Sequence, residues 1–269
     1  MSMMQRIITS VVGLVVFFVV LLTHEAVFFA AIAIIILLAL YEMHKALSSG
    51  AAVFSVSVVS ALILLFGQFW GDMELSLILA IMLYLISSVF LHTKKSFKDV
   101  YSSALITFFL TFFFGTLIKL RAEFGAEAVF LVFLLAWVTD SGAYFSGKFF
   151  GKHKLIPAVS PKKTVEGALG GIISTVVFTC LYIAVLRFAF DIRTVGGASY
   201  LGAGVLAAVA SVFAQLGDLV ASVVKRDCNV KDFGTILPGH GGIMDRFDSV
   251  VFIAPMVFYY FVYFNKWVI

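Results

Sequence analysis

One stretch of the chain, residues 222–249, concentrates the residue types that chemistry requires. It reads SVVKRDCNVKDFGTILPGHGGIMDRFDS and holds four Lys or Arg, four Asp, one His and four Gly. The segments on either side are long, apolar and almost without charge. Ionisable groups are costly within membrane-like segments, so a dense cluster of them between two such segments suggests a functional position. This stretch is therefore the first candidate for a reaction centre.

Two aspartates near the end of this stretch have the spacing of a metal site. Asp245 and Asp248 are three residues apart, so a helix beginning near Met244 would project both from one side. Gly241 and Gly242 precede them, and the backbone N–H groups of glycines at a helix N-terminus can approach an anion. His240 could contact a lipid headgroup, form a hydrogen bond within the loop, or transfer a proton. A simple capping role for Asp245, or a pair with Arg246, is the structural alternative.

A second acidic position lies on the preceding apolar segment. Asp218, Ser222 and Lys225 recur at helical spacing, so they share one face near the polar stretch. Hard carboxylate oxygens are the ligands that Mg²⁺ prefers. We expect Asp218, Asp245 and Asp248 to bind Mg²⁺, and the pattern leaves a second cation open.

A further polar region precedes residue 167. Asp140, Tyr144 and Lys148 recur every four residues and lead into the polar loop KHKLIPAVSPKKTVEG. Hydroxyl and ammonium groups in this loop suit a polyphosphate. The candidate binding residues there are Ser160, Lys162, Lys163, Thr164 and Glu166. The alternative is that these lysines only contact anionic lipid headgroups.

The composition places the whole chain in a membrane. Hydrophobic residues make up 62% of 269 positions and charged residues 13%, whereas a globular domain has about a quarter charged residues. The net charge of +4 belongs to the loops, so we expect the bilayer and no nucleic acid as a partner. The predicted fold is an all-α bundle. Residues 1–130 would form N-terminal transmembrane helices, and residues 131–269 would carry the site.

Nine apolar runs are long enough to cross about 30 Å of hydrocarbon as helices. Most of the 19 Lys and Arg then fall on one side of the membrane. The positive-inside rule places the N-terminus in the cytoplasm, the C-terminus outside, and the loops 148–166 and 225–248 in the cytoplasm. The runs lie near 7–23, 26–43, 53–70, 75–91, 101–118, 128–147, 167–189, 200–224 and 249–265. Glycines such as Gly170 and Gly171 favour close helix packing and leave a homodimer open.

The spacing of the polar residues resembles the signature of phosphatidate cytidylyltransferases, also called CDP-diacylglycerol synthases. The matching positions near the end of the chain are Ser222-x-x-Lys225-Arg226, Lys231-Asp232-x-Gly234 and Leu237-Pro238-x-His240-Gly241-Gly242-Ile243-x-Asp245-Arg246-Phe247-Asp248. Two upstream patterns are also similar to this family: Trp137-x-x-Asp140-x-x-Ala143-Tyr144-x-x-Gly147 and Ser160-Pro161-Lys162-Lys163-Thr164-x-Glu166-Gly167. One departure is Asn229, where relatives often carry glycine, and Asn tolerates a left-handed turn.

The resemblance implies transfer of CMP from CTP to phosphatidate on the cytoplasmic face of a bacterial cytoplasmic membrane. Both substrates are anionic, so cations and metal are needed to offset their repulsion. The expected catalytic residues are Lys225, Arg226, His240, Asp245, Arg246 and Asp248. The expected substrate-binding residues are Asp140, Tyr144, Lys148, Ser160, Lys162, Lys163, Thr164, Glu166, Ser222, Lys231, Asp232, Gly241 and Gly242.

Two other functions are compatible with the same inventory. A lipid-alcohol kinase using CTP or ATP would present the γ-phosphorus to a hydroxyl and would need a general base. A secondary transporter would use Asp140 and Asp218 as ion ligands within the membrane. Transporters commonly show repeated halves and sites at the bilayer midplane. Here the polar groups gather towards one membrane face and no internal repeat is visible.

Overall fold

The computed structural model describes residues 3–189, 200–236, 239 and 241–264. These residues form eight helices and one small two-stranded sheet. They gather into two compact units, one made of 1–118 with 228–246, the other of 119–227 with 247–269. The chain passes from one unit to the other within helices α5 and α8, and between Asp227 and Cys228.

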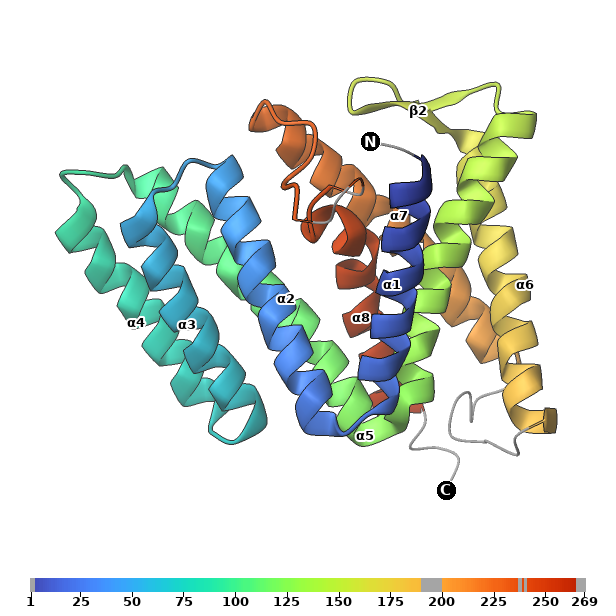
Figure 1. Cartoon of the computed structure of the whole chain (residues 1–269), viewed down its shortest axis with the longest axis horizontal. Coiled ribbons are helices and arrows are strands. Elements are labelled where there is room, and N and C mark those ends of the chain that lie inside the picture. The colour runs from blue at the N-terminus through green and yellow to red at the C-terminus, as the bar shows by residue number, and fades with distance from the viewer. Residues whose placement is uncertain (1–2, 190–199, 237–238, 240, 265–269) are drawn as a thin grey trace. The chain divides into compact units, whose positions relative to one another are not determined.

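The first unit contains the N-terminal helices. They are α1 (Met3–Leu22), α2 (Glu25–Ala46), α3 (Ala51–Phe69), α4 (Met73–Leu91) and the start of α5 (Phe97–Phe150). Consecutive helices from α1 to α4 pack against each other, and α3 and α4 lie side by side along their length (Figure 1). Asp72 starts α4 by accepting hydrogen bonds from the N–H groups of Glu74 and Leu75 at 2.8 and 3.2 Å.

Helix α5 is one run of 54 residues broken at Gly125. This glycine has φ 88° and ψ −179°, a backbone conformation that side chains disfavour. The break lies between two predicted crossings, 101–118 and 128–147, which both fall within α5. At 1.5 Å per residue the two arms together measure about 80 Å, more than twice the hydrocarbon thickness.

The second unit contains the remaining elements. They are the end of α5, strands β1 (Lys154–Ile156) and β2 (Ser160–Thr164), α6 (Val165–Ala189), α7 (Tyr200–Asp227) and most of α8 (Met244–Phe264). The strands form an antiparallel hairpin with Lys154 opposite Thr164 and Ile156 opposite Ser160. The sequence predicted only a polar loop here. The hairpin packs against α6 (Figure 1), so the lysines of β2 have defined positions.

Small residues set the spacing of α5 and α6. A methyl group added at Gly142 would collide with Ser174, and one added at Gly170 would collide with Ser146. Between α6 and α7, the Gln215 side chain donates a hydrogen bond to the Ala168 carbonyl at 3.2 Å. The predicted role of Gly167, Gly170 and Gly171 in close helix packing is confirmed, whereas Gly204, predicted with them, has only an ordinary contact.

The helices identify an integral membrane protein. Seven of them, α2 to α8, are long and apolar enough to span a bilayer, and α1 holds a shorter apolar stretch, Ile8–Leu22. Large side chains such as Phe90, Leu105 and Phe188 are 71–86% exposed, as expected of surfaces that face lipid. The all-α fold is confirmed, and the count of nine crossings stays a prediction.

A buried polar network joins three helices of the first unit. The Tyr84 hydroxyl of α4 lies 2.7 Å from both the Ser57 hydroxyl of α3 and the Thr107 hydroxyl of α5. Tyr84 is only 2% exposed and both partners are fully buried. In an apolar surrounding such groups must satisfy each other, so the network fixes how α3, α4 and α5 pack.

We predict that Tyr84→Phe destabilises the protein by about 0.5–2 kcal/mol, because the Ser57 and Thr107 hydroxyls each lose one of their hydrogen bonds. The measurement is the thermal unfolding midpoint of the purified protein in detergent. Tyr41→Phe is the matched control, since Tyr41 is 47% exposed on α2. Equal midpoints for the two variants would contradict a stabilising role for the network.

Candidate active site

Three carboxylates from three helices of the second unit come together. Asp140 lies on α5, Asp218 on α7 and Asp248 on α8, and the charges of Asp140 and Asp218 both act on Asp248. One oxygen of Asp248 accepts a hydrogen bond from the N–H of Ser249 at 2.8 Å. Like charges gathered in this way need cations to offset their repulsion.

Two lysines supply positive charge to this cluster. The Lys163 ammonium lies 2.6 Å from Oδ2 of Asp218 and also donates to the Gln215 carbonyl at 3.2 Å. The charge of Lys225 also acts on Asp248. Because Lys163 belongs to β2, the hairpin is the element that brings this cation to α7. Carboxylates and ammonium groups side by side can bind a metal-bridged phosphate.

Two predicted binding residues hold the hairpin to α6. Oγ1 of Thr164 accepts a hydrogen bond from the N–H of Gly167 at 3.1 Å, as a capping residue does. The Glu166 carboxylate accepts N–H bonds from Lys152 at 3.0 Å and His153 at 3.2 Å, and lies 2.6 Å from Nδ1 of His153. These contacts position the hairpin, and the substrate-binding roles of both residues stay predictions.

The other predicted residues of the second unit are on α5, β2 and α7. Tyr144 and Lys148 are exposed on α5, with the Lys148 ammonium 6.0 Å from the centre of the Tyr144 ring. Lys162 is exposed on β2, beside a half-buried Ser160. Ser222 and Arg226 lie in the last two turns of α7, where Ser222 is half-buried and Arg226 exposed.

The first unit holds the remaining predicted residues in one segment, 231–246. Oδ2 of Asp245 accepts hydrogen bonds from the N–H groups of Phe233 at 2.8 Å and Gly242 at 3.0 Å. Asp245 therefore holds its own loop by hydrogen bonds, which resembles the alternative role in which it only caps the helix. Lys231, Asp232 and Arg246 are exposed, and Gly241 has φ 84°. His240 lies outside the described residues.

Asn229 lies in the turn that leads into this segment. Asn229 has φ 55°, which is the left-handed conformation. Asn adopts this conformation more readily than most residues other than glycine. The departure from the family pattern is therefore compatible with the local backbone.

Glu42 is a residue that the sequence analysis missed. It lies on α2, is 1% exposed, and accepts hydrogen bonds from the N–H groups of Ile243 and Met244, both at 2.9 Å. The only available signal was an acidic residue inside an apolar run, which is costly unless the charge is satisfied. Its partners are about 200 positions away in sequence, so spacing could not reveal them.

The carboxylates of the second unit suit the requirements of Mg²⁺. Among the described residues, no three His, Cys, Asp or Glu side chains form a ready-made metal site. Mg²⁺ usually takes only one or two carboxylates and completes its shell with water and substrate phosphates. Asp218 and Asp248 meet that requirement, because both are carboxylates and the charge of Asp218 acts on Asp248.

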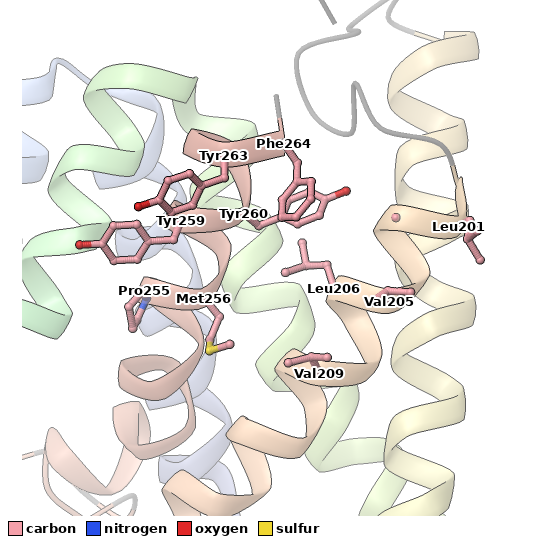
Figure 2. A pocket seen from close by; sticks show the side chains of 11 residues that line it. Leu201, Val205, Leu206, Val209, Pro255, Met256, Tyr259, Tyr260, Tyr263 and Phe264 are labelled. Carbon is pink, nitrogen blue, oxygen red and sulfur yellow. The ribbon is translucent and has the colours of Figure 1, made fainter. Parts of the chain in front are cut away.

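The second unit also has an apolar pocket of about 680 Å³ between α7 and α8. Figure 2 shows Leu206 and Val209 from α7 facing Met256 and Tyr260 from α8. These positions lie in the first half of α7 and the second half of α8, whereas Asp218 lies in the second half of α7 and Asp248 in the first two turns of α8. Its apolar lining makes it unsuitable for a triphosphate.

Comparisons with known proteins agree with this chemistry. Residues 4–264 match the model of the cytidylyltransferase family. The phosphatidate cytidylyltransferase of Bacillus subtilis is 34% identical, over 96% of this chain and 97% of its own length. The proteins of the same name from Staphylococcus saprophyticus and Staphylococcus aureus (strain COL) are 34% and 35% identical, each over 95% of this chain and 97% of their own length.

Gly217, next to Asp218, sets the distance between α7 and α8. A methyl group there would lie 2.5 Å from the Asp248 carbonyl oxygen and 2.7 Å from the Phe252 ring. We predict that Gly217→Ala forces the two helices apart and costs about 1–3 kcal/mol of stability. Thermal unfolding in detergent measures the change.

Gly204→Ala on the same helix is the control for this prediction. A methyl group at Gly204 would meet only Val176, at an ordinary 3.7 Å. Alanine is the better helix former, so this variant should be neutral or slightly stabilised. A Gly217→Ala protein as stable as Gly204→Ala would show that the helices are not in close contact at Gly217.

Proposed function

Since the chain belongs to the cytidylyltransferase family, we propose that it transfers CMP from CTP to phosphatidate, giving CDP-diacylglycerol and pyrophosphate. The observation that carries the proposal is the similarity to phosphatidate cytidylyltransferases along nearly the whole chain. The cluster of carboxylates and lysines in the second unit supports it, because such groups suit metal-assisted transfer between two phosphates. The enzyme is thus a nucleotidyltransferase of phospholipid biosynthesis.

The reaction proposed is a direct displacement at phosphorus. A phosphate oxygen of phosphatidate forms a bond to the α-phosphorus of CTP, and the bond from that phosphorus to the β-phosphate oxygen breaks. Pyrophosphate leaves with the electron pair of the broken bond. Because the attacking phosphate is already ionised at neutral pH, no strong general base is required, and His240 is better suited to binding phosphate.

We infer that Asp218 and Asp248 hold Mg²⁺ together with substrate phosphates. When bound, the ion supplies positive charge to the attacking and leaving oxygens. Asp245 was predicted as a third ligand, and its Oδ2 accepts two backbone N–H bonds within its own loop. A second cation stays a hypothesis from the sequence.

Lysine and arginine side chains would offset the remaining negative charge. Lys163 and Lys225 belong to the acidic cluster and are proposed to bind the triphosphate. Arg226 and Arg246 are exposed, which suits contact with phosphate groups arriving from water or from the membrane surface. These contacts position the substrates and stabilise charge in the transition state.

For the topology we propose nine crossings, with the site at the cytoplasmic face of a bacterial cytoplasmic membrane. The 54 residues of α5, broken at Gly125, suit two crossings, and α1 adds one to the remaining six. The bias of Lys and Arg supports a cytoplasmic N-terminus. The relatives are bacterial proteins. A homodimer stays a prediction.

An odd number of crossings places the two termini on opposite sides. We predict that alkaline phosphatase fused after Ile269 is active in a bacterial host, because this reporter folds only outside the cytoplasm. A green fluorescent protein fused at the same point should be dark. The reverse pattern of the two reporters would contradict nine crossings with a cytoplasmic N-terminus.

The decisive test of function is incubation of the purified protein with CTP, phosphatidate and Mg²⁺. We expect pyrophosphate and CDP-diacylglycerol in equal amounts, and no turnover when a chelator removes the metal. Asp248→Asn should lower kcat at least about 100-fold, since it removes a charge proposed to hold the metal. CDP as the nucleotide product would instead indicate a kinase.

Asp227→Asn is the control for the carboxylate variant. Asp227 is exposed at the end of α7, nine residues after Asp218 and outside the acidic cluster. This variant should keep kcat within about twofold of the unmodified enzyme, as surface substitutions usually do. Full activity of Asp248→Asn would remove Asp248 from the proposed metal site.

A further inference from the structure

We propose that Glu42 is a positioning residue that holds the segment 231–246 in its active arrangement. The inference rests on the proposed function, because that segment carries Asp245 and Arg246, which are expected to act in the reaction. Glu42 lies on α2, far from this segment in sequence. The residue and the segment both belong to the first unit. No motif that points to the reaction includes Glu42.

The hydrogen bonds of Glu42 define its role. One carboxylate oxygen accepts the N–H of Ile243 and the other accepts the N–H of Met244, each at 2.9 Å. Met244 is the first residue of α8, so its N–H has no partner within the helix. Glu42 therefore caps α8 from a different helix, and its negative charge is stabilised by the N-terminal end of the helix dipole.

The side chain of Glu42 is buried and closely packed. It is 1% exposed. A methyl group added at Gly234 or at Gly242 would collide with its carboxylate. The two glycines let the backbone of the segment approach the Glu42 carboxylate closely, so the backbone is held by packing as well as by hydrogen bonds.

Glu42 works together with Asp245. Oδ2 of Asp245 accepts the N–H groups of Phe233 and Gly242, so the two carboxylates together accept four backbone N–H bonds of one segment. Their charges act on each other. Such repulsion is tolerated because each carboxylate faces N–H donors. Loss of Glu42 would release the N-terminal turn of α8, where Asp245 and Arg246 lie.

This position matters because phosphoryl transfer depends on alignment. A displacement of about 1 Å in a catalytic constellation can cost about 100-fold in rate. Glu42→Gln keeps the size of the side chain, removes the charge and turns an N–H₂ group towards a backbone N–H. We expect kcat to fall at least about tenfold and the KM for CTP to rise several-fold, since the segment also carries Lys231 and Gly241.

The experiment compares Glu42→Gln with Glu25→Gln, an exposed carboxylate on the same helix. Both variants are assayed for kcat and for the KM of CTP, and hydrogen–deuterium exchange is measured for the amides of 232–246 and of α4. Glu42→Gln should speed exchange in 232–246 by at least about tenfold and leave α4 unchanged. Glu25→Gln should match the unmodified protein in every measurement.

A second variant keeps the test decisive if Glu42→Gln does not fold. Glu42→Asp retains the charge but is shorter by one methylene, so it should give a smaller change in the same direction. An unchanged KM with exchange raised equally in 232–246 and in α4 would mean a general loss of stability and would overturn the proposal. If the unmodified protein makes no CDP-diacylglycerol, the function fails, while exchange in 232–246 still decides whether Glu42 holds the segment.

Discussion

The structure depends on one constraint, which is that a carboxylate near a lipid-facing helix must have donors or cations around it. Glu42 meets the constraint with two backbone N–H groups, Asp245 with two more, and Asp218 with the Lys163 ammonium. The contacts of Glu42 and of Lys163 join segments that are distant in sequence, whereas those of Asp245 stay within its own loop. Satisfying the acids therefore also builds the loops in which the chemistry is expected.

The same constraint explains why the positions of the polar side chains depend on short elements such as the hairpin of β1 and β2. Lys163 reaches α7 only because the hairpin of β1 and β2 is held to α6, and Glu166 holds it by accepting N–H bonds from Lys152 and His153. Residues that looked like a set of phosphate ligands thus divide into two kinds. Some face the acidic cluster, and others fix the backbone that carries them.

Local patterns allowed much of the fold to be predicted from sequence. Apolar runs gave the helices, the glycines of α6 indicated close packing, and Asn229 adopts the left-handed turn. The hairpin was missed because three-residue and five-residue strands leave almost no periodic signal. Pairs such as Lys163 with Asp218 could not be predicted, since tertiary packing alone brings them together.

The glycines of the signature show how a motif can encode contacts with residues outside it. Gly242 was expected to offer its N–H to an anionic substrate, yet that N–H is donated to Asp245 and its Cα faces Glu42. Gly217, which lies outside the signature, similarly faces the backbone of α8 at Asp248. At both positions the absence of a side chain lets another chain segment approach a carboxylate-bearing one. The small residues are thus explained first by the packing that holds the acids in place, and substrate binding need not be their direct task.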